Sequence, residues 1–224
     1  MASQLSVVVP ILNEEPQLPE LFQHLSPLSH HQIIFVDGGS DDQSTRLVQQ
    51  AGFSLVQSEK GRARQMNAGA AMATGDIVLF LHADTRLPPS AEQLIIESMY
   101  NTGKVWGRFD ARITGNHWLL PVVARMMSWR SRLTGIATGD QAIFIRRSVF
   151  NRLGGFSDIP LMEDIEISRR LNRESKPVCL RACVTTSGRR WMSRGVLRTI
   201  VLMWYLRFAY WRGVSPEKLA SLYR

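Results

Sequence analysis

Residues 77–81 (IVLFL) form an unbroken apolar run that stops at His82-Ala83-Asp84. An apolar run without alternation indicates a strand that is covered on both faces, as in a parallel sheet between two layers of helices. Ligands of open α/β sheets bind beyond the carboxyl ends of such strands. The sequence therefore delivers an imidazole and a carboxylate to a binding position, and Asp84 is the candidate ligand for a divalent cation.

Strand-like runs alternate with helical patterns along the chain, which predicts βαβ units and an α/β fold with a mostly parallel sheet and helices on both faces. No repeat, low-complexity tract or linker divides the 224 residues, so a single domain over 1–224 is expected. Strands are expected at 5–9, 33–36, 53–56, 77–81, 105–113, 142–145 and 178–184, and helices at 17–25, 43–51, 62–73, 91–100, 118–133 and 164–172.

The composition excludes disordered and fibrous classes, because 45% of the residues are hydrophobic and 21% are charged. The net charge of +8 lies in residues 181–224, which hold nine Lys or Arg against Glu217 alone. The excess is thus a feature of the C-terminal segment, and a nucleic-acid-binding surface over the whole chain is not indicated. Such a segment could meet nucleotide phosphates, an anionic membrane or RNA, or it could form a solvated face.

Residues 194–224 form a basic, aromatic-rich segment that is expected to be helical. The apolar part is too short and, with Arg198 and Arg207, too charged to span a bilayer. Two alternatives stay open: peripheral membrane contact through residues 196–212, or packing on the sheet.

The first residues lack the features of a signal peptide, and Cys179 and Cys183 do not make a disulfide framework or a zinc site. Both observations favour a reducing, cytoplasmic location, with any membrane contact peripheral and at the inner face.

Polar residues follow the first two predicted strands. Pro10, Asn13 and Glu14 lie in a turn where backbone groups are free to face a flat base. Asp37 ends the second strand and is followed by Gly38, which permits close backbone approach. Its carboxylate could accept a hydrogen bond from a base imide or a ribose hydroxyl, or it could close an Asx turn.

A basic cluster of Lys60, Arg62 and Arg64 precedes the 77–81 run. Guanidinium groups suit a diphosphate because they offer several donors in a fixed fork. Mg²⁺ and similar cations take oxygen ligands and borrow most of them from substrate phosphates and water, so Asp84 alone could suffice. His82 could instead be a hydrogen-bonded histidine at a strand end.

Glu163 and Asp164 are adjacent carboxylates at the start of a predicted helix. Adjacent carboxylates raise each other's proton affinity, which suits a general base. Capping of the helix is the competing interpretation.

In this order the motifs resemble the family 2 glycosyltransferases with a GT-A fold. The resemblance covers nearly all of residues 5–191 and is carried by VVVPILNEE, VDGGSDD, NAGAAMATGDIVLFLHAD, GDQAIFIRRSVFNRLGGF and MEDIEISRRL. The segments GRARQMN, WGRF and TSGRRW are more narrowly similar to a bacterial subgroup called radical-SAM/selenodomain-associated transferase 2.

The resemblance implies a hexosyltransferase-type enzyme that transfers a sugar from a UDP- or GDP-sugar to an acceptor hydroxyl with inversion. It implies Mg²⁺ or Mn²⁺ on Asp84, and Asp164, in an E-D element with Glu163, as the catalytic base. The residues that the resemblance assigns to binding of the nucleotide-sugar are Pro10, Asn13, Glu14, Asp37, Gly38, Arg62, Arg64, His82, Asp84, Arg190 and Trp191.

The chain departs from the family pattern at three positions: His82 replaces the first Asp of D-x-D, Gly38 the second Asp of V-D-D-G-S, and Ser187 a usual Gln. Two rival functions remain. A nucleotidyltransferase would need a glycine-rich phosphate loop where this chain has PILNEE, and a non-catalytic nucleotide-sugar- or RNA-binding protein would use the basic C-terminus. The acceptor is not indicated.

Overall fold

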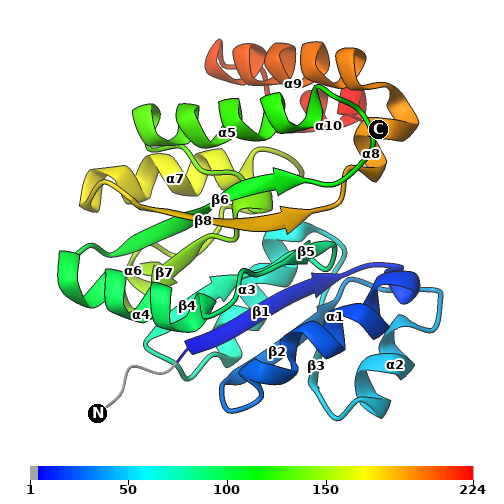
Figure 1. Cartoon of the computed structure of the whole chain (residues 1–224), viewed down its shortest axis with the longest axis vertical. Helices are drawn as coiled ribbons and strands as arrows, with labels where there is room; N and C mark the ends of the chain where they lie inside the picture. Colours follow the sequence, from blue (N-terminus) through cyan, green and yellow to red (C-terminus); the bar gives the residue numbers. More distant parts are fainter. Residues whose placement is uncertain (1–4, 224) are drawn as a thin grey trace.

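An eight-stranded sheet runs through the whole molecule (Figure 1). The computed structural model describes residues 5–223. The strand order is β3-β2-β1-β4-β7-β6-β8-β5. The strands are β1 (Leu5–Ile11), β2 (Gln32–Asp37), β3 (Ser54–Gln57), β4 (Ile77–Phe80), β5 (Thr85–Arg86), β6 (Trp106–Ile113), β7 (Phe144–Arg146) and β8 (Val178–Thr186).

The four strands β3, β2, β1 and β4 are parallel neighbours, as the alternating sequence pattern predicts. Successive side chains of β1 point to opposite faces, so Val7 and Val9 join one core cluster while Val8 joins another. All three are fully buried. This arrangement explains why the strands read as continuous apolar runs.

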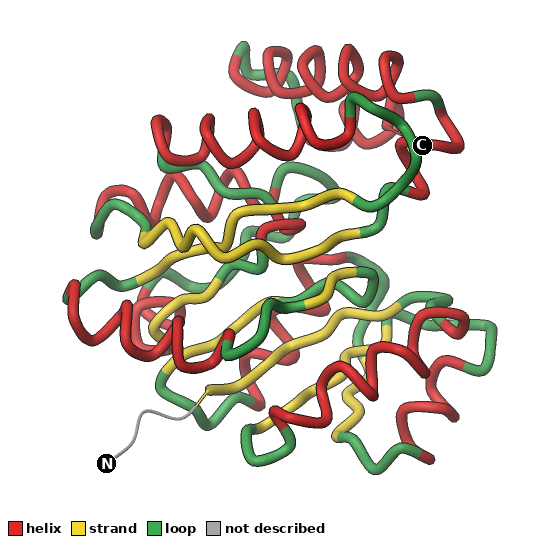
Figure 2. Tube along the Cα trace, viewed as in Figure 1, coloured by secondary structure: helices red, strands yellow, loops and turns green. Residues whose placement is uncertain are grey.

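Helices cover both faces of the sheet (Figure 2). On one face lie α1 (Leu18–Leu25), α2 (Ser44–Gln50) and α4 (Ala91–Thr102), and on the other lie α3 (Arg62–Met72), α6 (Arg147–Arg152) and α7 (Glu163–Glu174). The expected fold class, a mostly parallel sheet between two helical layers, is confirmed.

The second half of the sheet is mixed. β7 pairs antiparallel with both β4 and β6, β6 pairs parallel with β8, and β8 pairs antiparallel with β5. Because β7 runs opposite to β4, its beginning lies beside the carboxyl end of β4. The backbone N–H of Phe80 donates to the carbonyl of Ile143 at 2.9 Å.

Four helices lie beyond β6 and β8: α5 (Leu120–Thr134), α8 (Arg189–Arg194), α9 (Val196–Trp211) and α10 (Pro216–Tyr223) (Figure 1). Leu206 and Ala209 of α9 pack with Met162 and Ile165 at the start of α7. The C-terminal segment therefore packs on the rest of the fold through one of its faces.

The remaining short helices are η1 (Glu15–Gln17), η2 (Ser26–Leu28) and η3 (Gly139–Gln141). Each predicted strand and helix is present, with ends that differ by one or two residues. The strand predicted at 142–145 begins at Phe144, because Ala142 has a left-handed backbone (φ 48°). Sequence patterns missed β5, α6 and α8, which are too short for a clear period, whereas α9 and α10 lie within the segment 194–224 that was expected to be helical.

Gly69 lets α3 approach the sheet closely. A Cβ atom built there lies 2.4 Å from Cγ1 of Val8 and 2.8 Å from Cγ2 of Val36. We expect Gly69→Ala to lower the free energy of unfolding by about 1–3 kcal/mol, because the added methyl group overpacks the core. Urea denaturation measures the loss. Ala71→Ser, at an exposed position of the same helix, is the matched control, and equal midpoints for the two variants would contradict the close packing.

Candidate active site

The carboxyl ends of three parallel strands meet at one edge of the sheet. Ile11 of β1 is in register with Asp37 of β2, and the N–H of Leu81 donates to the carbonyl of Val8 at 3.0 Å. The polar residues that follow β1, β2 and β4 are thereby brought to the same edge. The sequence predicted this meeting from strand direction alone.

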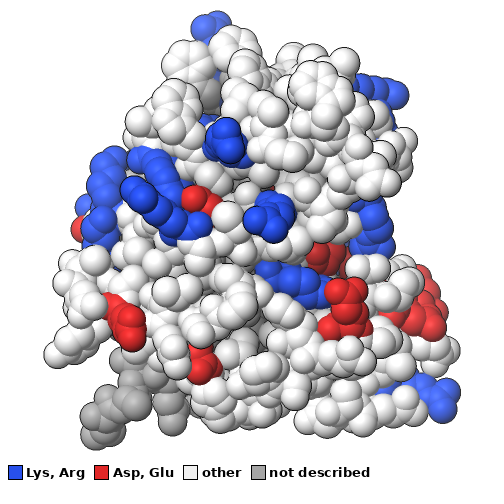
Figure 3. Space-filling model, in the orientation of Figure 1, with Lys and Arg blue, Asp and Glu red and all other residues white. Residues whose placement is uncertain are grey.

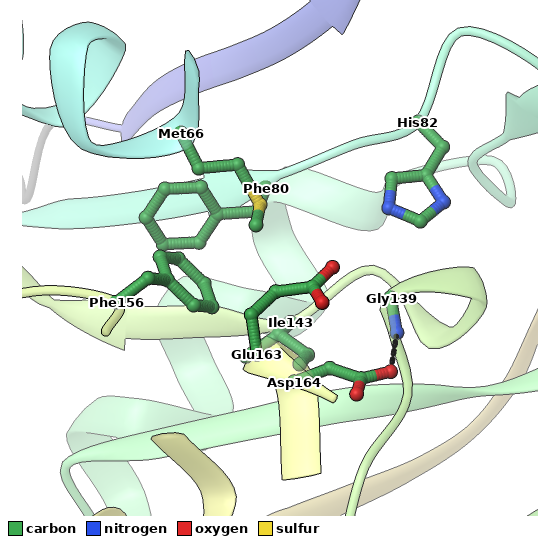
Figure 4. Close-up of a pocket in the computed structure, with 8 residues that line it drawn as sticks. All are labelled: Met66, Phe80, His82, Gly139, Ile143, Phe156, Glu163 and Asp164. Carbon is green, nitrogen blue, oxygen red and sulfur yellow. Dashed lines mark hydrogen bonds between the residues drawn. The ribbon is translucent and has the colours of Figure 1, made fainter. Parts of the chain in front are cut away.

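A narrow pocket lies between this edge and the start of α7 (Figure 4). Its apolar wall consists of Met66, Phe80, Ile143 and Phe156, and its polar side is formed by His82, Gly139, Glu163 and Asp164. In Figure 4 the carboxylate of Glu163 points toward the imidazole of His82, and the carboxylate of Asp164 accepts a hydrogen bond from the N–H of Gly139. The pocket thus joins residues that the sequence assigned to separate motifs.

His82 is held between two neighbours from η3. Its Nδ1 lies 3.4 Å from Oδ1 of Asp140, and its ring packs on Gly139, where an added Cβ would lie 2.3 Å from Cε1. Its Nε2 is buried without a hydrogen-bond partner among the described residues. The imidazole is therefore fixed in orientation, and its Nε2 is left with unused hydrogen-bonding capacity at the wall of the pocket.

Glu163 and Asp164 begin α7. Glu163 is 5% exposed, and burial followed by the charge of Asp164 raises its pKa. The Oδ1 of Asp164 accepts from the N–H of Ile165 at 2.7 Å, and its Oδ2 accepts from the N–H of Gly139 at 3.1 Å. These bonds hold Asp164 in one orientation at the pocket.

Arg62 stands among the acidic residues of the site. Its Nη1 lies 3.8 Å from Oε1 of Glu163. Burial works to lower its pKa, but the charges of Glu163, Asp140, Asp164 and Asp84 outweigh it and raise the pKa. The Arg62 side chain is about half exposed, so donors of its guanidinium group can reach a phosphate group.

Glu14 joins the site from the turn after β1. Burial, and next the charge of Asp84, raise its pKa against the lowering effect of Arg189, His82 and Arg62. The negative charges of Glu14 and Asp84 thus act on each other without full neutralisation. A cation between them would relieve the repulsion.

The surroundings of Asp84 fit a hard divalent cation. Among the described residues, the hydrogen-bond donor to its carboxylate is the hydroxyl of Thr85, at a long 3.3 Å. The group of three potential metal ligands found among the described residues lies elsewhere, at His30, His31 and Glu92 near the start of β2. At Asp84 the protein offers too few converging ligands for a closed site, so phosphates and water would complete the coordination.

Asp37 shapes the loop after β2. It is 2% exposed, and its carboxylate accepts from the N–H groups of Gly39 and Ser40 and from the hydroxyl of Ser40 at 2.5 Å. This is the Asx turn that the sequence left open. Asn13 ties the turn after β1 to the same loop: its N–H donates to Ser40, and its Oδ1 accepts from Asp41.

Gly38 leaves room for Gln65, whose Nε2 donates to the carbonyls of Ile11 and Val36 at 2.7 and 2.9 Å. A Cβ at position 38 would lie 2.8 Å from Cδ of Gln65. This contact gives a packing reason for glycine at the position where the family pattern has Asp. Pro10, half-buried at the end of β1 beside Val36, lies at the same edge.

Arg190 and Arg62 are near each other, whereas Arg64 lies apart. Burial, and then the charges of Arg62 and Arg194, lower the pKa of Arg190, while Asp140 and Asp84 oppose the shift. Arg64 pairs with Asp158 at 2.8 Å and with Glu59. Its role in donor binding stays a prediction.

Trp191 packs with an apolar cluster beneath α5 and α9 that includes Leu120 and Val196. It therefore anchors α8, which carries Arg190 to the site.

Three non-glycine residues with left-handed backbone border the site: Asn13 (φ 55°), Ala142 (φ 48°) and Met162 (φ 72°). Such conformations are uncommon and gather where the fold must place functional groups. Met162 directly precedes Glu163, so the strained residue sets the direction from which α7 begins.

Asp140 is the site residue that sequence reasoning missed. Burial works to raise its pKa, but the hydrogen bond and charge of His82, with Arg62 and Arg190, lower it overall. It stands just before the apolar run of β7, which was a usable signal. The antiparallel direction of β7, which brings that run's beginning to the site, has no local sequence signature.

Comparison with known proteins gives consistent results. The profile of Glycosyl transferase family 2 matches residues 6–154. The chain is 28% identical over 156 residues to an undecaprenyl-phosphate 4-deoxy-4-formamido-L-arabinose transferase of Aeromonas hydrophila, covering 63% of this chain and 48% of that protein. The corresponding protein of Klebsiella pneumoniae is 26% identical and is also covered over 48%. The chain spans about half the length of these curated relatives.

Solved structures share the fold. S. aureus TarS 1–349 in complex with UDP superposes with a TM-score of 0.69 at 18% identity, over 82% of this chain and 60% of that one. Glucosyl-3-phosphoglycerate synthase from Mycobacterium tuberculosis, in complex with Mn²⁺, UDP and glucosyl-3-phosphoglycerate, gives 0.60 at 19% identity, over 89% and 79%. The profile match over more than half of the chain shows that this protein belongs to glycosyl transferase family 2.

Proposed function

We propose that the protein transfers a sugar from a nucleotide-diphosphate sugar to an acceptor hydroxyl, with inversion at the anomeric carbon. The observation that carries the proposal is the meeting of Arg62, Asp84 and Asp164 at one end of the sheet. The family's fold accommodates UDP in TarS and in glucosyl-3-phosphoglycerate synthase.

The donor diphosphate is assigned to the basic side of the site. The negative charges of Asp84 and Asp140 act on both Arg62 and Arg190. Both guanidinium groups can donate hydrogen bonds to phosphate oxygens. Asp84 would hold Mg²⁺ or Mn²⁺, which neutralises charge that develops on the leaving diphosphate. The turns after β1 and β2 would hold the nucleoside.

Asp164 is assigned to the acceptor side. Its carboxylate is oriented by two backbone N–H groups and retains lone pairs that can accept the proton of a hydroxyl. Glu163, whose pKa is raised, supports the site by its contact with Arg62. A base on the side opposite the leaving group leads to inversion.

Two rival activities have separate outcomes. A nucleotidyltransferase would release pyrophosphate from a nucleoside triphosphate, whereas a glycosyltransferase releases a nucleoside diphosphate. A binding-only protein would bind UDP- or GDP-sugars without turnover, and binding to RNA would weaken steeply with salt. Family membership favours sugar transfer.

Membrane contact is proposed through the outer faces of α5 and α9. No helix in the described part of the chain combines the length and apolarity needed to cross a bilayer. Exposed apolar residues recur at helical spacing on both helices, which lie next to each other (Figure 1). They are Val122, Met126, Trp129 and Leu133 on α5 and Leu197, Val201, Trp204, Phe208 and Trp211 on α9.

The charge around these stripes favours an anionic membrane over a second copy of the chain. Neither α5 nor α9 contains an acidic residue, and both carry arginines. In Figure 3 basic side chains border uncharged atoms over this end of the molecule, while most acidic side chains lie over the N-terminal half. Two copies joined face to face would bring like charges together, whereas anionic lipid headgroups complement them.

Asp164→Asn and Asp84→Ala should separate chemistry from donor binding. We expect Asp164→Asn to lower the turnover number by about 10²–10⁴-fold, because general-base help has that size, and to retain UDP binding. Asp84→Ala should instead weaken Mn²⁺-dependent UDP binding. Titration calorimetry with UDP, with and without Mn²⁺, measures binding, and nucleoside-diphosphate release from UDP- and GDP-sugars measures turnover.

Glu97→Gln, at an exposed position of α4, is the control that should change neither quantity. Full turnover by Asp164→Asn with every donor tested would exclude Asp164 as the base. Unchanged Mn²⁺ dependence in Asp84→Ala would exclude Asp84 as the metal ligand.

Trp204→Ala combined with Phe208→Ala should reduce membrane binding. Burial of an aromatic side chain contributes roughly 1.5–3 kcal/mol, so we expect at least a tenfold loss of partition onto vesicles containing phosphatidylglycerol. Sedimentation with vesicles measures it, with Tyr100→Ala, an exposed aromatic residue on α4, as the control. If the wild-type protein does not bind these vesicles and elutes as a dimer in size-exclusion chromatography, the exposed apolar residues of α5 and α9 form a subunit interface instead.

A further inference from the structure

Two arginines beside Asp164 lack a counterion. Arg130 belongs to α5 and Arg207 to α9. The Nε and Nη2 atoms of Arg130 are buried and have no hydrogen-bond partner among the described residues. Within residues 5–223, Arg207 likewise makes no ion pair or hydrogen bond through its side chain. Both side chains are half-buried, and guanidinium groups withdrawn from water are normally paired, so these two arginines need an explanation.

The two arginines occupy the same seam between helices. Val123 of α5 packs in one cluster with Val196 and Ile200 of α9. Arg130 lies about two helical turns after Val123, and Arg207 about two turns after Ile200, so both project from the faces that meet in this cluster. The seam is apolar at its start and carries two cations further along.

The electrostatics agree with this placement. Burial, and next the charge of Arg207, lower the pKa of Arg130 to about 9, while Asp164 opposes the shift. Burial also lowers the pKa of Arg207, against the attraction of Asp164 and Asp140. The positive charges of Arg130 and Arg207 therefore repel each other. The charge of Asp164 acts on both arginines, but Asp164 forms an ion pair with neither.

The charge of Asp164 acts on Arg62 and also on Arg130 and Arg207, which belong to the seam between α5 and α9. Asp140 influences Arg207 as well as Arg62 and Arg190, but Asp84, the residue assigned to the donor metal, influences Arg62 and Arg190 and is not among the charges that act on Arg130 and Arg207. A group bound by Arg130 and Arg207 would therefore sit on the side of Asp164 away from the donor diphosphate. That is the side from which an acceptor hydroxyl must approach.

We propose that Arg130 and Arg207 bind a phosphate group of the acceptor, so that the acceptor is a phosphate-bearing molecule whose hydroxyl faces Asp164. A phosphate monoester matches two guanidinium forks because it carries a charge of about −1.5 to −2 and offers three acceptor oxygens. This inference rests on the proposed glycosyl transfer. The phosphate belongs either to a soluble metabolite or to a lipid.

The test uses the full chain with UDP and Mn²⁺ present in excess, so that the donor diphosphate position is occupied. Glycerol 3-phosphate is titrated calorimetrically, with glycerol as the uncharged control. We expect the wild type to bind glycerol 3-phosphate, and Arg130→Gln or Arg207→Gln to weaken that binding by about tenfold or more while UDP binding is unchanged. Arg125→Gln, an exposed arginine on α5, is the matched control.

A second readout separates ligand binding from a structural role. Since each of the two variants removes a half-buried charge that has no ion pair among the described residues, the Tm without ligands should stay the same or rise. Arg130→Lys should retain part of the affinity. A lowered Tm together with lost UDP binding would show a structural role and overturn the inference.

Vesicles of phosphatidylcholine with phosphatidic acid distinguish the two sources of phosphate. Binding of the free probe shows that a soluble phosphate is sufficient, and binding of these vesicles alone, sensitive to the same two variants, shows a lipid-borne phosphate. If UDP binds but neither probe does, or if both variants bind the probe as the wild type does, the inference is wrong and the proposed function stands. If UDP itself does not bind, the proposed function fails first.

Discussion

The antiparallel pairing of β7 with β4 is the contact on which the site depends. Leu79 is in register with Phe144, so the beginning of β7 and the end of β4 lie side by side. Gly139 and Asp140 are consequently placed against His82, and the backbone N–H of Gly139 reaches Asp164. A parallel β7 would send this segment to the other edge of the sheet and leave the N-terminal half without its acidic partner.

Mutual compensation of charge organises the pocket. The charge of Arg62 interacts with four carboxylates from three parts of the chain, and without it these carboxylates would raise one another's proton affinity further. Glu14 and Glu163 show that compensation is incomplete, because their pKa values are raised. Near Arg130 and Arg207 the imbalance is reversed, because these two arginines have no ion pair among the described residues. The site is thus polarised: the half near Asp84 lacks positive charge, which a divalent cation would bring, and the half near Arg130 and Arg207 lacks negative charge, which an acceptor phosphate would bring.

The sequence predicts the positions of groups that follow parallel strands. Asp37 and Asp84 reach the same edge because the carboxyl ends of parallel strands meet there. It does not predict Asp140, whose position depends on strand direction, or the left-handed residues Ala142 and Met162, which tertiary contacts impose.

Arg62 and Arg64 have different partners because of helix geometry. Side chains two residues apart on a helix point in nearly opposite directions, so Arg62 faces the carboxylates of the site and Arg64 pairs with Asp158. Attention to this periodicity could have separated the two arginines at the outset. No comparable rule was available for Arg130 and Arg207, which meet only through the packing of α5 and α9.

The close packing of His82 on Gly139 links two positions that are far apart in the sequence. Any side chain at 139 would collide with the imidazole, so the histidine is compatible only with glycine there. The shorter Asp that the family pattern has at position 82 would vacate this space and free position 139 to carry a side chain. Exchange of one residue therefore changes what the other can be, and the two positions constitute a single steric unit.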